Sequence, residues 1–467
     1  MKTHEGANAY ESTQDAAVEF FSKAGSAFSK KKSFYQEEVD ILKLFEPAFR
    51  DDEVLAFKLA LWVRDCRGGA GNRSGARKVL KWLALARPEW LELNMKWVPE
   101  IGRWDDLRCL FDTPLRNKVA KFWADAIVAN NQLAAKWADR ADVPIRKALG
   151  LSIGDFRRLL AKIRKDGIVE HKMCQNIWGD IIYNHVPSVA MSRYTKAFAK
   201  HDGYRFTAFK ELLKKGETTI KADVLFPHDC VRTVKYGDKE IADAQFDALP
   251  NFMTQDEMVM VICDTSGSMS TQVAGSIEAI DVSQGLALYC SAKMPEVSPF
   301  YKRFIGFCSE ASFKDWRGLS FSKAVESRKI FDHAVGSTRI DKALDFILAF
   351  AKEKRIPQIY MPSTLMIISD MQFSSGAATG ANDDTEIEKC LRSWEVAGYN
   401  RPKILYWNLS QYSGSTATVA MKNVGMISGF STAVLKAVFS GTDFSPRAIM
   451  LRALEKYNEI VVPTNLR

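Results

Sequence analysis

Apolar residues in the first 250 positions recur at helical spacing. One stripe falls between residues 15 and 24, and a dense apolar stretch at 54–63 runs into a glycine-rich segment. Further apolar sets follow at 79–85, 107–111, 119–128 and 133–137. Recurrence every three or four residues is typical of amphipathic helices that bury one face. We therefore predict an all-helical domain over residues 1–250, arranged as a HEAT-like repeat solenoid or ring, although no fixed repeat period is visible.

From about residue 251 onward, short β-prone runs alternate with helical stretches. The runs predict strands at 258–263, 300–308, 364–370 and 403–408. The stretches between and after them predict helices near 280–289, 338–353, 385–397, 431–439 and 445–457. Strands that alternate with helices form a parallel sheet covered on both faces, with sites at the carboxyl ends of the strands. Residues 251–467 are thus predicted to form a Rossmann-like α/β domain, which makes the fold class α plus α/β.

The composition is that of a folded cytoplasmic protein. Of the 467 residues, 47% are hydrophobic and 26% are charged, which supports cores in two or three domains and excludes a disordered chain. No apolar run approaches the roughly 18–20 residues of a membrane span, and the first residues lack the apolar core of a signal peptide. The eight cysteines are scattered singly. We expect free thiols in a reducing cytoplasm, which argues against zinc and redox chemistry.

Little in the sequence indicates catalysis. The histidines have no spacing typical of metal ligands, and no Ser–His–Asp or Cys–His set can be assembled. His228 and Asp229 adjoin Pro227 and favour a structural turn. The segment Gly-Gly-Ala-Gly at 68–71 follows a helix and lacks the Gly-Lys-Ser/Thr ending of a phosphate loop, so it predicts a tight turn between helices. The chain is therefore predicted not to be an enzyme.

The positive charge is concentrated in one segment. The whole chain has 65 Lys or Arg and 56 Asp or Glu, a net charge of +9, and residues 140–221 alone have 17 against 8, also +9. Within that segment, Arg193, Lys196 and Lys200 share a helical face by their spacing. Aromatic residues are interleaved with these cations, at Tyr183, Tyr194, Phe198, Tyr204 and Phe206. A localised basic face with stacking groups is typical of nucleic-acid binding, and a solvated face that aids solubility is the alternative.

An oxygen-rich sequence follows the first predicted strand. Residues 261–269 read Val-Ile-Cys-Asp-Thr-Ser-Gly-Ser-Met, which places an Asp-x-Ser-x-Ser motif at the end of an apolar run. Its carboxylate and two hydroxyls can direct three oxygens to one point, and such thiol-free sets suit Mg²⁺, Mn²⁺ or Ca²⁺ rather than zinc. A polar loop after a strand is the alternative. Thr338, just before a predicted helix, and Asp370, at the end of a later strand, favour the metal site.

This order of residues resembles the metal-ion-dependent adhesion site of von Willebrand factor A domains. In that family the two serines and the threonine bind the metal directly, and the aspartates act largely through water. The resemblance implies a Mg²⁺ site, with Mn²⁺ and Ca²⁺ as alternatives, formed by Asp264, Ser266, Ser268, Thr338 and Asp370. It also implies that an open metal position takes a carboxylate from a protein partner rather than supporting hydrolysis.

A second resemblance covers nearly the whole chain. Similarity to the TROVE module of Ro autoantigen-type RNA-binding proteins is carried by residues 57–71 and 97–107, which read FKLALWVRDCRGGAG and WVPEIGRWDDL. Residues 184–194 and 225–229, which read NHVPSVAMSRY and LFPHD, are closer to an uncharacterised Ro-like family of bacteria, phages and large viruses. This resemblance implies a monomeric ring or horseshoe of helical repeats closed by a von Willebrand factor A domain, in the cytoplasm of a bacterial or virus-infected cell.

In Ro proteins a basic outer surface holds small structured RNAs, and a central hole accepts single-stranded ends of misfolded RNAs. The resemblance therefore implies a non-catalytic RNA-binding protein that forms a ribonucleoprotein. The basic stretch 149–160 matches that family only in outline, so the candidate RNA-binding residues are taken as a group, consisting of Arg157, Arg158, Arg164, Arg193, Lys196, Lys200 and Arg205. The alternative is a metal-dependent protein-interaction adaptor with no RNA role, in which the basic segment aids solubility or contacts an acidic protein.

Overall fold

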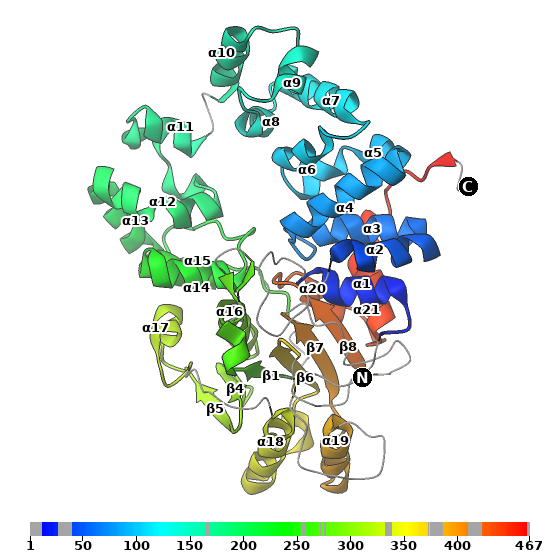
Figure 1. Cartoon of the computed structure of the whole chain (residues 1–467). Helices are drawn as coiled ribbons and strands as arrows, with labels where there is room; N and C mark the ends of the chain where they lie inside the picture. The colour runs from blue at the N-terminus through cyan, green and yellow to red at the C-terminus, as the bar shows by residue number, and fades with distance from the viewer. Residues whose placement is uncertain are drawn as a thin grey trace.

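The computed structural model describes residues 12–26, 40–164, 168–253, 258–270, 272–274, 277–331, 339–371, 373, 386–409 and 423–464. Helices of the N-terminal half form an arc, and a six-stranded α/β domain lies between the two ends of that arc (Figure 1). Both parts of the predicted fold class are confirmed, because the first part is helical and the second is built on a mostly parallel sheet. Among the described residues, no helix has the length and apolarity needed to cross a membrane.

Two limbs make up the helical arc. The first limb, blue to cyan in Figure 1, consists of α1 (Ala16–Ala24), α2 (Ile41–Asp51), α3 (Glu53–Arg64), α4 (Arg73–Ala86), α5 (Pro88–Asn94), α6 (Trp97–Ile101), the 3₁₀ turn η1 (Trp104–Leu110), α7 (Arg116–Val128), α8 (Gln132–Trp137), α9 (Val143–Ala148) and α10 (Ile153–Ile163). The second limb, in green, consists of α11 (Val169–Cys174), α12 (Ser188–His201), α13 (Gly203–Lys214), α14 (Pro227–Tyr236) and α15 (Lys239–Asp247).

Polar side chains fix where several of these helices begin. Asp52 accepts a hydrogen bond from the backbone N–H of Leu55 at 2.9 Å, and Asn72 accepts one from Gly75 at 2.8 Å. Ser152 caps α10 in the same way. Each cap satisfies a backbone donor that has no partner within its own helix.

The glycine-rich segment 68–71 is a tight turn between α3 and α4, as predicted. Gly71 has φ +71°, a left-handed conformation that favours glycine. A Cβ atom on Gly69 would lie 2.0 Å from the carbonyl oxygen of Trp62, so no larger residue fits there. Asp65 completes the turn by accepting hydrogen bonds from the N–H groups of Arg67 and Gly68, at 2.8 and 3.0 Å.

The six strands are ordered β5-β4-β1-β6-β7-β8. Their bounds are β1 (Val259–Asp264), β4 (Arg303–Phe307), β5 (Ala311–Asp315), β6 (Thr364–Ser369), β7 (Lys403–Asn408) and β8 (Val424–Ser428), and a separate two-stranded hairpin joins β2 (Gln272–Ala274) to β3 (Ile277–Glu278). β1, β4, β6, β7 and β8 are mutually parallel, and every residue of β1 and β6 is buried.

The sheet differs from the sequence prediction at both edges. β5 runs antiparallel to β4, so the sheet is mixed rather than fully parallel, and β8 is an additional strand. β5 is half exposed and follows β4 after a three-residue turn, in which Cys308 N–H donates to Glu310. An edge strand of this kind has too little apolar character to be recognised from periodicity.

The predicted helices of this half are present as α16 (Ala279–Ala292), α18 (Ile340–Lys354), α19 (Glu386–Val396), α20 (Val434–Phe439) and α21 (Pro446–Leu454), and α17 (Phe321–Glu326) is additional. The α16 helix packs on β1, β4 and β6, whereas α18 packs on β4 and β5. The sheet is therefore enclosed by helices, as alternating strands and helices require.

Both ends of the arc are attached to the α/β domain. At the first end, Ser428 at the end of β8 donates to the carbonyl of Phe21 in α1 at 3.0 Å, and Ser26 donates to the carbonyl of Asn408, the last residue of β7, at 2.6 Å. At the other end, α14 packs on α16 so closely that a Cβ on Gly285 would meet the backbone of His228 at 2.7 Å. The arc is thus closed through the α/β domain.

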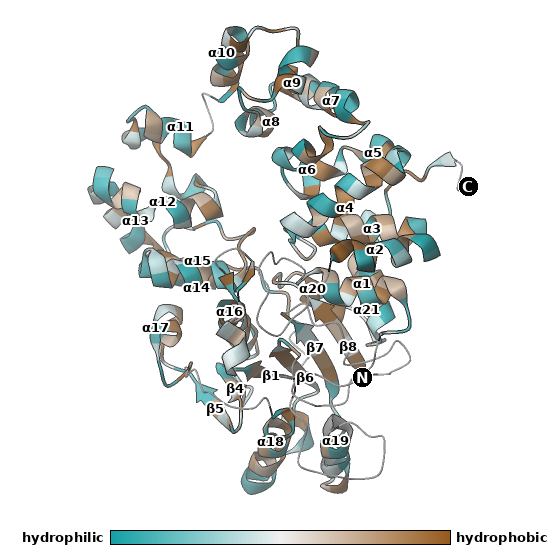
Figure 2. Ribbon diagram, viewed as in Figure 1, coloured by the Kyte–Doolittle hydropathy of each residue, from teal (hydrophilic) through white to brown (hydrophobic). Residues whose placement is uncertain are grey.

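Two hydrophobic cores divide the arc. The larger one runs from α1 to α10 and continues into the sheet, and a smaller one is confined to residues between Val169 and Ile241. Figure 2 shows brown, hydrophobic residues along β1, β6, β7 and β8 and teal, hydrophilic residues on the outer ends of the helices. Where the two cores adjoin, Lys136 of α8 forms an ion pair with Glu170 of α11 at 3.1 Å. The eight cysteines all lie among the described residues and none of them forms a disulfide, in agreement with the prediction.

Candidate functional site

Two buried carboxylates mark the carboxyl edge of the sheet. Asp264 is the last residue of β1 and Asp370 directly follows β6, the strand paired with β1. The Asp264 carboxylate accepts a hydrogen bond from Ser266 N–H at 2.9 Å and another from the Ser369 hydroxyl at 2.6 Å. Ser369 was not among the predicted ligands, although its position as the last residue of the buried strand β6, directly before Asp370, is a signal for it.

Hydroxyl groups complete the described part of this cluster. The Ser266 and Ser268 hydroxyl oxygens lie 3.0 Å apart, so four of the five predicted metal ligands belong to the two strand ends. The fifth, Thr338, lies outside the described residues. Its neighbour Arg339 donates its backbone N–H to Cys308 at 3.1 Å, directly after Phe307, the register partner of Asp264.

The electrostatics of the pair favour a bound cation. Burial, followed by the charge of Asp370, raises the pKa of Asp264 to about 7, against the lowering effect of hydrogen bonds from Ser369 and Ser266. Two carboxylates that burial and mutual repulsion destabilise gain from a shared cation. The donor set consists of carboxylate and hydroxyl oxygens, which fit a hard divalent ion such as Mg²⁺. No cluster of three or more His, Cys, Asp or Glu ligands occurs in the parts of the chain that the structure describes.

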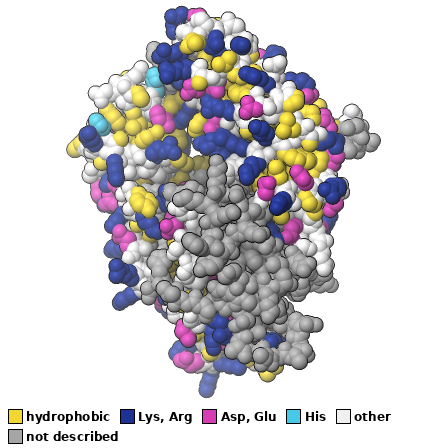
Figure 3. Space-filling model, in the orientation of Figure 1, with side chains coloured by type: hydrophobic (Ala, Val, Ile, Leu, Met, Phe, Trp, Pro, Cys, Tyr) yellow, Lys and Arg dark blue, Asp and Glu magenta, His cyan; other side chains and the backbone are white. Residues whose placement is uncertain are grey.

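The predicted basic residues divide between two helical groups. Arg157, Arg158 and Arg164 belong to α10 and its C-terminus, whereas Arg193, Lys196 and Lys200 lie on the exposed face of α12 and Arg205 lies on the neighbouring α13. Figure 3 shows Lys and Arg side chains gathered on the upper part of one face, over the helical arc. The α10 helix packs against the larger hydrophobic core and α12 against the smaller one. The pocket beside α10 contains the first group and not the second.

Three of the seven predicted cations are bound to carboxylate or carbonyl oxygens within the protein. Arg205 donates to the carbonyls of Trp178 and Ile181 and pairs with Asp202, so it holds a turn together. Arg158 pairs with Asp155 one turn away on α10.

Arg164, the third, donates to the carbonyl groups of Ala135 and Ala138. Burial lowers the pKa of Arg164, against the nearby charge of Asp139.

The other four, Arg157, Arg193, Lys196 and Lys200, are exposed and have no carboxylate partner among the residues that the structure describes. Of the interleaved aromatic residues, Tyr183, Phe198 and Phe206 are buried core residues, which corrects their expected role as stacking groups. Tyr204 at the start of α13 is 90% exposed and remains available for stacking.

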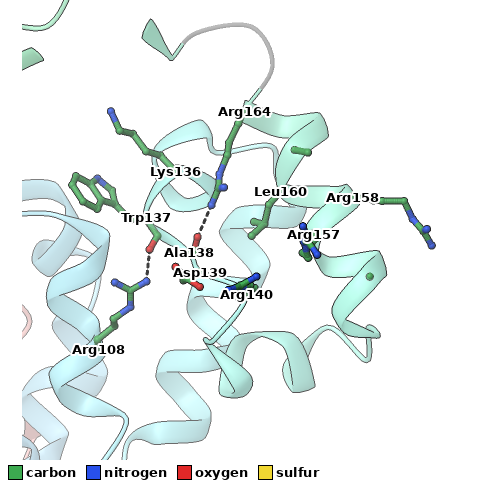
Figure 4. Close-up of a pocket in the computed structure, with 12 residues that line it drawn as sticks. Arg108, Lys136, Trp137, Ala138, Asp139, Arg140, Arg157, Arg158, Leu160 and Arg164 are labelled. Carbon is green, nitrogen blue, oxygen red and sulfur yellow. Dashed lines mark hydrogen bonds between the residues drawn. The ribbon is translucent and has the colours of Figure 1, made fainter. Parts of the chain in front are cut away.

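A cavity of about 970 Å³ lies between α8 and α10 (Figure 4). It contains the predicted Arg157, Arg158 and Arg164, together with residues that sequence reasoning did not select, namely Arg108, Lys136, Trp137 and Arg140. Arg140 belongs to the basic segment 140–221, but no other cation of that segment lies three or four residues from it, so helical spacing did not point to it.

A charge-compensated cluster lies where α3, α4 and η1 meet. Arg64 and Arg77 contact Asp106 at 2.6 and 2.7 Å, and Arg73 pairs with both Asp105 and Asp106. Burial alone would raise the pKa of Asp106, but Arg64 and Arg77 lower it. These arginines are committed to the two aspartates, so the cluster holds α3, α4 and η1 together.

The fold and its two clusters define a class of two-part protein, in which an α/β domain with an oxygen-rich strand edge closes a basic helical arc. The chain belongs to the family described as a domain of unknown function, DUF2828, which matches residues 3–144 and 153–268. A second family, described as a domain of unknown function, DUF7788, matches residues 258–459.

Individual relatives extend over the whole chain. The uncharacterized protein L728 of Acanthamoeba polyphaga mimivirus is 25% identical over 520 residues, which cover 97% of this chain and 87% of that protein. The crystal structure of the Deinococcus radiodurans RO (RSR) protein aligns over 95% of this chain and 99% of its own, at 13% identity and a TM-score of 0.36.

Proposed function

We propose that this protein is a non-catalytic RNA-binding protein whose helical arc contacts RNA. The proposal rests on a set of exposed cations that have no carboxylate partner in the described part of the chain, Arg157, Arg193, Lys196 and Lys200. They belong to the segment 140–221, whose net charge equals that of the whole chain. The TROVE-like motifs at 57–71 and 97–107 point to the same class of ligand.

Contacts of this kind bind phosphates more than bases. Exposed lysines and arginines gain affinity by releasing counterions from the nucleic acid, so binding weakens steeply with salt and has little sequence preference. Tyr204 adds an exposed ring that can stack on an unpaired base. Structured small RNAs with single-stranded portions are the ligands that suit both features.

We propose in addition that Asp264, Ser266, Ser268 and Asp370 hold Mg²⁺, with Mn²⁺ or Ca²⁺ as alternatives and Thr338 as a further ligand. The raised pKa of Asp264 supports this, because a cation would relieve the repulsion between the two buried carboxylates. A metal at this edge supplies an open position for a carboxylate from a protein partner. This second function, a metal-dependent adaptor, stands beside RNA binding and does not require it.

Two variants separate these functions. The charge reversal R157E/R193E/K196E/K200E is expected to abolish RNA binding, measured by fluorescence anisotropy with a labelled RNA hairpin, and to leave Mg²⁺ binding intact. Asp264→Ala is expected to abolish Mg²⁺ binding, measured by calorimetry, and to leave RNA binding intact. If Asp264→Ala removes RNA binding while circular dichroism shows a folded protein, the two functions are not separate.

A further inference from the structure

The cavity between α8 and α10 has a cationic lining that its one carboxylate, Asp139, does not neutralise. Several of its cations are compensated, because Arg108 binds Asp142 at 2.8 Å and Lys136 binds Glu170 at 3.1 Å. Arg158 pairs with Asp155 and points away from the cavity (Figure 4). These residues shape the cavity wall but add little net charge to it.

Three guanidinium groups remain. Arg140 and Arg157 are exposed at the cavity rim and have no hydrogen-bond or ion-pair partner among the described residues. Arg164 is half-buried, and its hydrogen bonds go to carbonyl oxygens, which do not cancel its charge. Asp139 is the acidic residue of the lining, and it accepts a hydrogen bond from Ala141 N–H at 3.0 Å. Three cations against one carboxylate leave an excess of positive charge at a concave site.

The same cavity offers apolar surface. Leu160 and Ala138 are buried in its wall, Ala161 lies beside them, and the Trp137 ring stands at the edge (Figure 4). The Arg103 guanidinium lies 4.3 Å from the centre of that ring, which holds the ring in place. A volume of about 970 Å³ is at the upper end of the range of about 300–1,000 Å³ for pockets that enclose a small ligand.

We infer that this cavity binds one unpaired nucleotide of an RNA strand, with its phosphate on Arg140, Arg157 and Arg164 and its base against Trp137 and Leu160. This inference rests on the proposed RNA-binding function and assigns one subsite to it. Guanidinium groups suit phosphate because they donate paired hydrogen bonds in a fixed plane. A duplex is too wide and its bases are too well stacked to enter such a cavity, so the subsite selects single-stranded RNA.

The test compares two pairs of substitutions that remove the same charge. R140Q/R157Q changes the cavity, and K196Q/K200Q changes the exposed face of α12. Arg164 is left unchanged because its bonds to Ala135 and Ala138 support the fold. Binding is measured for a blunt RNA duplex and for the same duplex with a six-nucleotide overhang.

We expect the native protein to bind the overhang RNA about tenfold more tightly than the duplex. R140Q/R157Q should lose that preference. K196Q/K200Q should lower the affinity for both RNAs by the same factor and should therefore keep the preference for the overhang. If R140Q/R157Q also weakens both RNAs equally, the cavity is not a nucleotide subsite, although the protein still binds RNA. If the native protein binds neither RNA near physiological salt, the proposed function itself fails.

The overhang is prepared with a 5′-hydroxyl and with a 5′-phosphate to identify which phosphate is bound. Equal affinity for the two assigns the cavity to an internal phosphodiester, and a preference for the phosphorylated end assigns it to a terminal phosphate. Either result supports the inference only when R140Q/R157Q removes the overhang preference.

Discussion

The buried carboxylate pair makes the metal-free protein less stable as the pH rises. The pKa of Asp264 is about 7 in the folded protein, against an ordinary value of 3.8. At a pH between these two values, the folded protein therefore keeps a proton on this carboxyl group that the unfolded chain has lost. Its contribution to stability is therefore complete below pH 3.8 and is lost as the pH rises through 7. For a single group with these two values, raising the pH from about 5.5 to about 8.0 lowers the free energy of unfolding by about 2 kcal/mol.

Asp264→Asn removes this titration while keeping the shape of the side chain. In EDTA, raising the pH between these two values should lower the free energy of unfolding of the native protein by about 2 kcal/mol more than that of the Asn variant. The free energies are measured by urea unfolding followed through tryptophan fluorescence. With Mg²⁺ at pH 8.0, the native protein should recover that stability and the variant should not. Equal pH dependence of the two proteins in EDTA would refute the reasoning, because the pair would then not be destabilised by ionisation.

Two further predictions concern the helical arc. Asp106→Asn should lower the free energy of unfolding by about 3–5 kcal/mol, because it weakens the pairing of the buried Arg64 guanidinium, whereas Asp155→Asn, at an exposed pair, should leave the urea midpoint unchanged. Gly69→Ala should prevent the α3–α4 turn from closing and lower the melting temperature sharply, while Gly179→Ala, where a Cβ meets nothing within 4 Å, should not. Similar melting temperatures for the two alanine variants would contradict the account of the turn.

Apolar periodicity was sufficient to predict most elements of the fold. The buried runs that become β1, β6 and β7 were recognisable because every position is apolar or nearly so. β5 was not, since its exposed edge carries Ser312, Lys314 and Asp315. β8 contains Gly425, and its burial depends on β7 and α21, which the sequence of the strand does not reveal.

The candidate sites were predictable to different degrees. The carboxylates Asp264 and Asp370 are adjacent because both end parallel strands, and sequence alone predicts that arrangement. Whether a basic side chain is exposed or bound within the protein is not predictable in this way. Arg157 and Arg205 look alike in the sequence, yet one is exposed and the other is bound to two carbonyls, because only the folded chain brings Trp178 and Ile181 to Arg205.

The salt dependence of RNA affinity tests the central claim most directly. Affinity for a hairpin with a 3′ single-stranded tail is measured between about 50 and 300 mM salt, with and without Mg²⁺, for the native protein and for R157Q/R193Q/K196Q/K200Q, which removes the four charges without reversing them. If each of the four cations contacts one phosphate, the slope of log affinity against log salt should become shallower by about 3, and Mg²⁺ should act only as added salt. Tail-independent binding with the same slope in both proteins, or no binding near physiological salt, would contradict RNA binding by this surface.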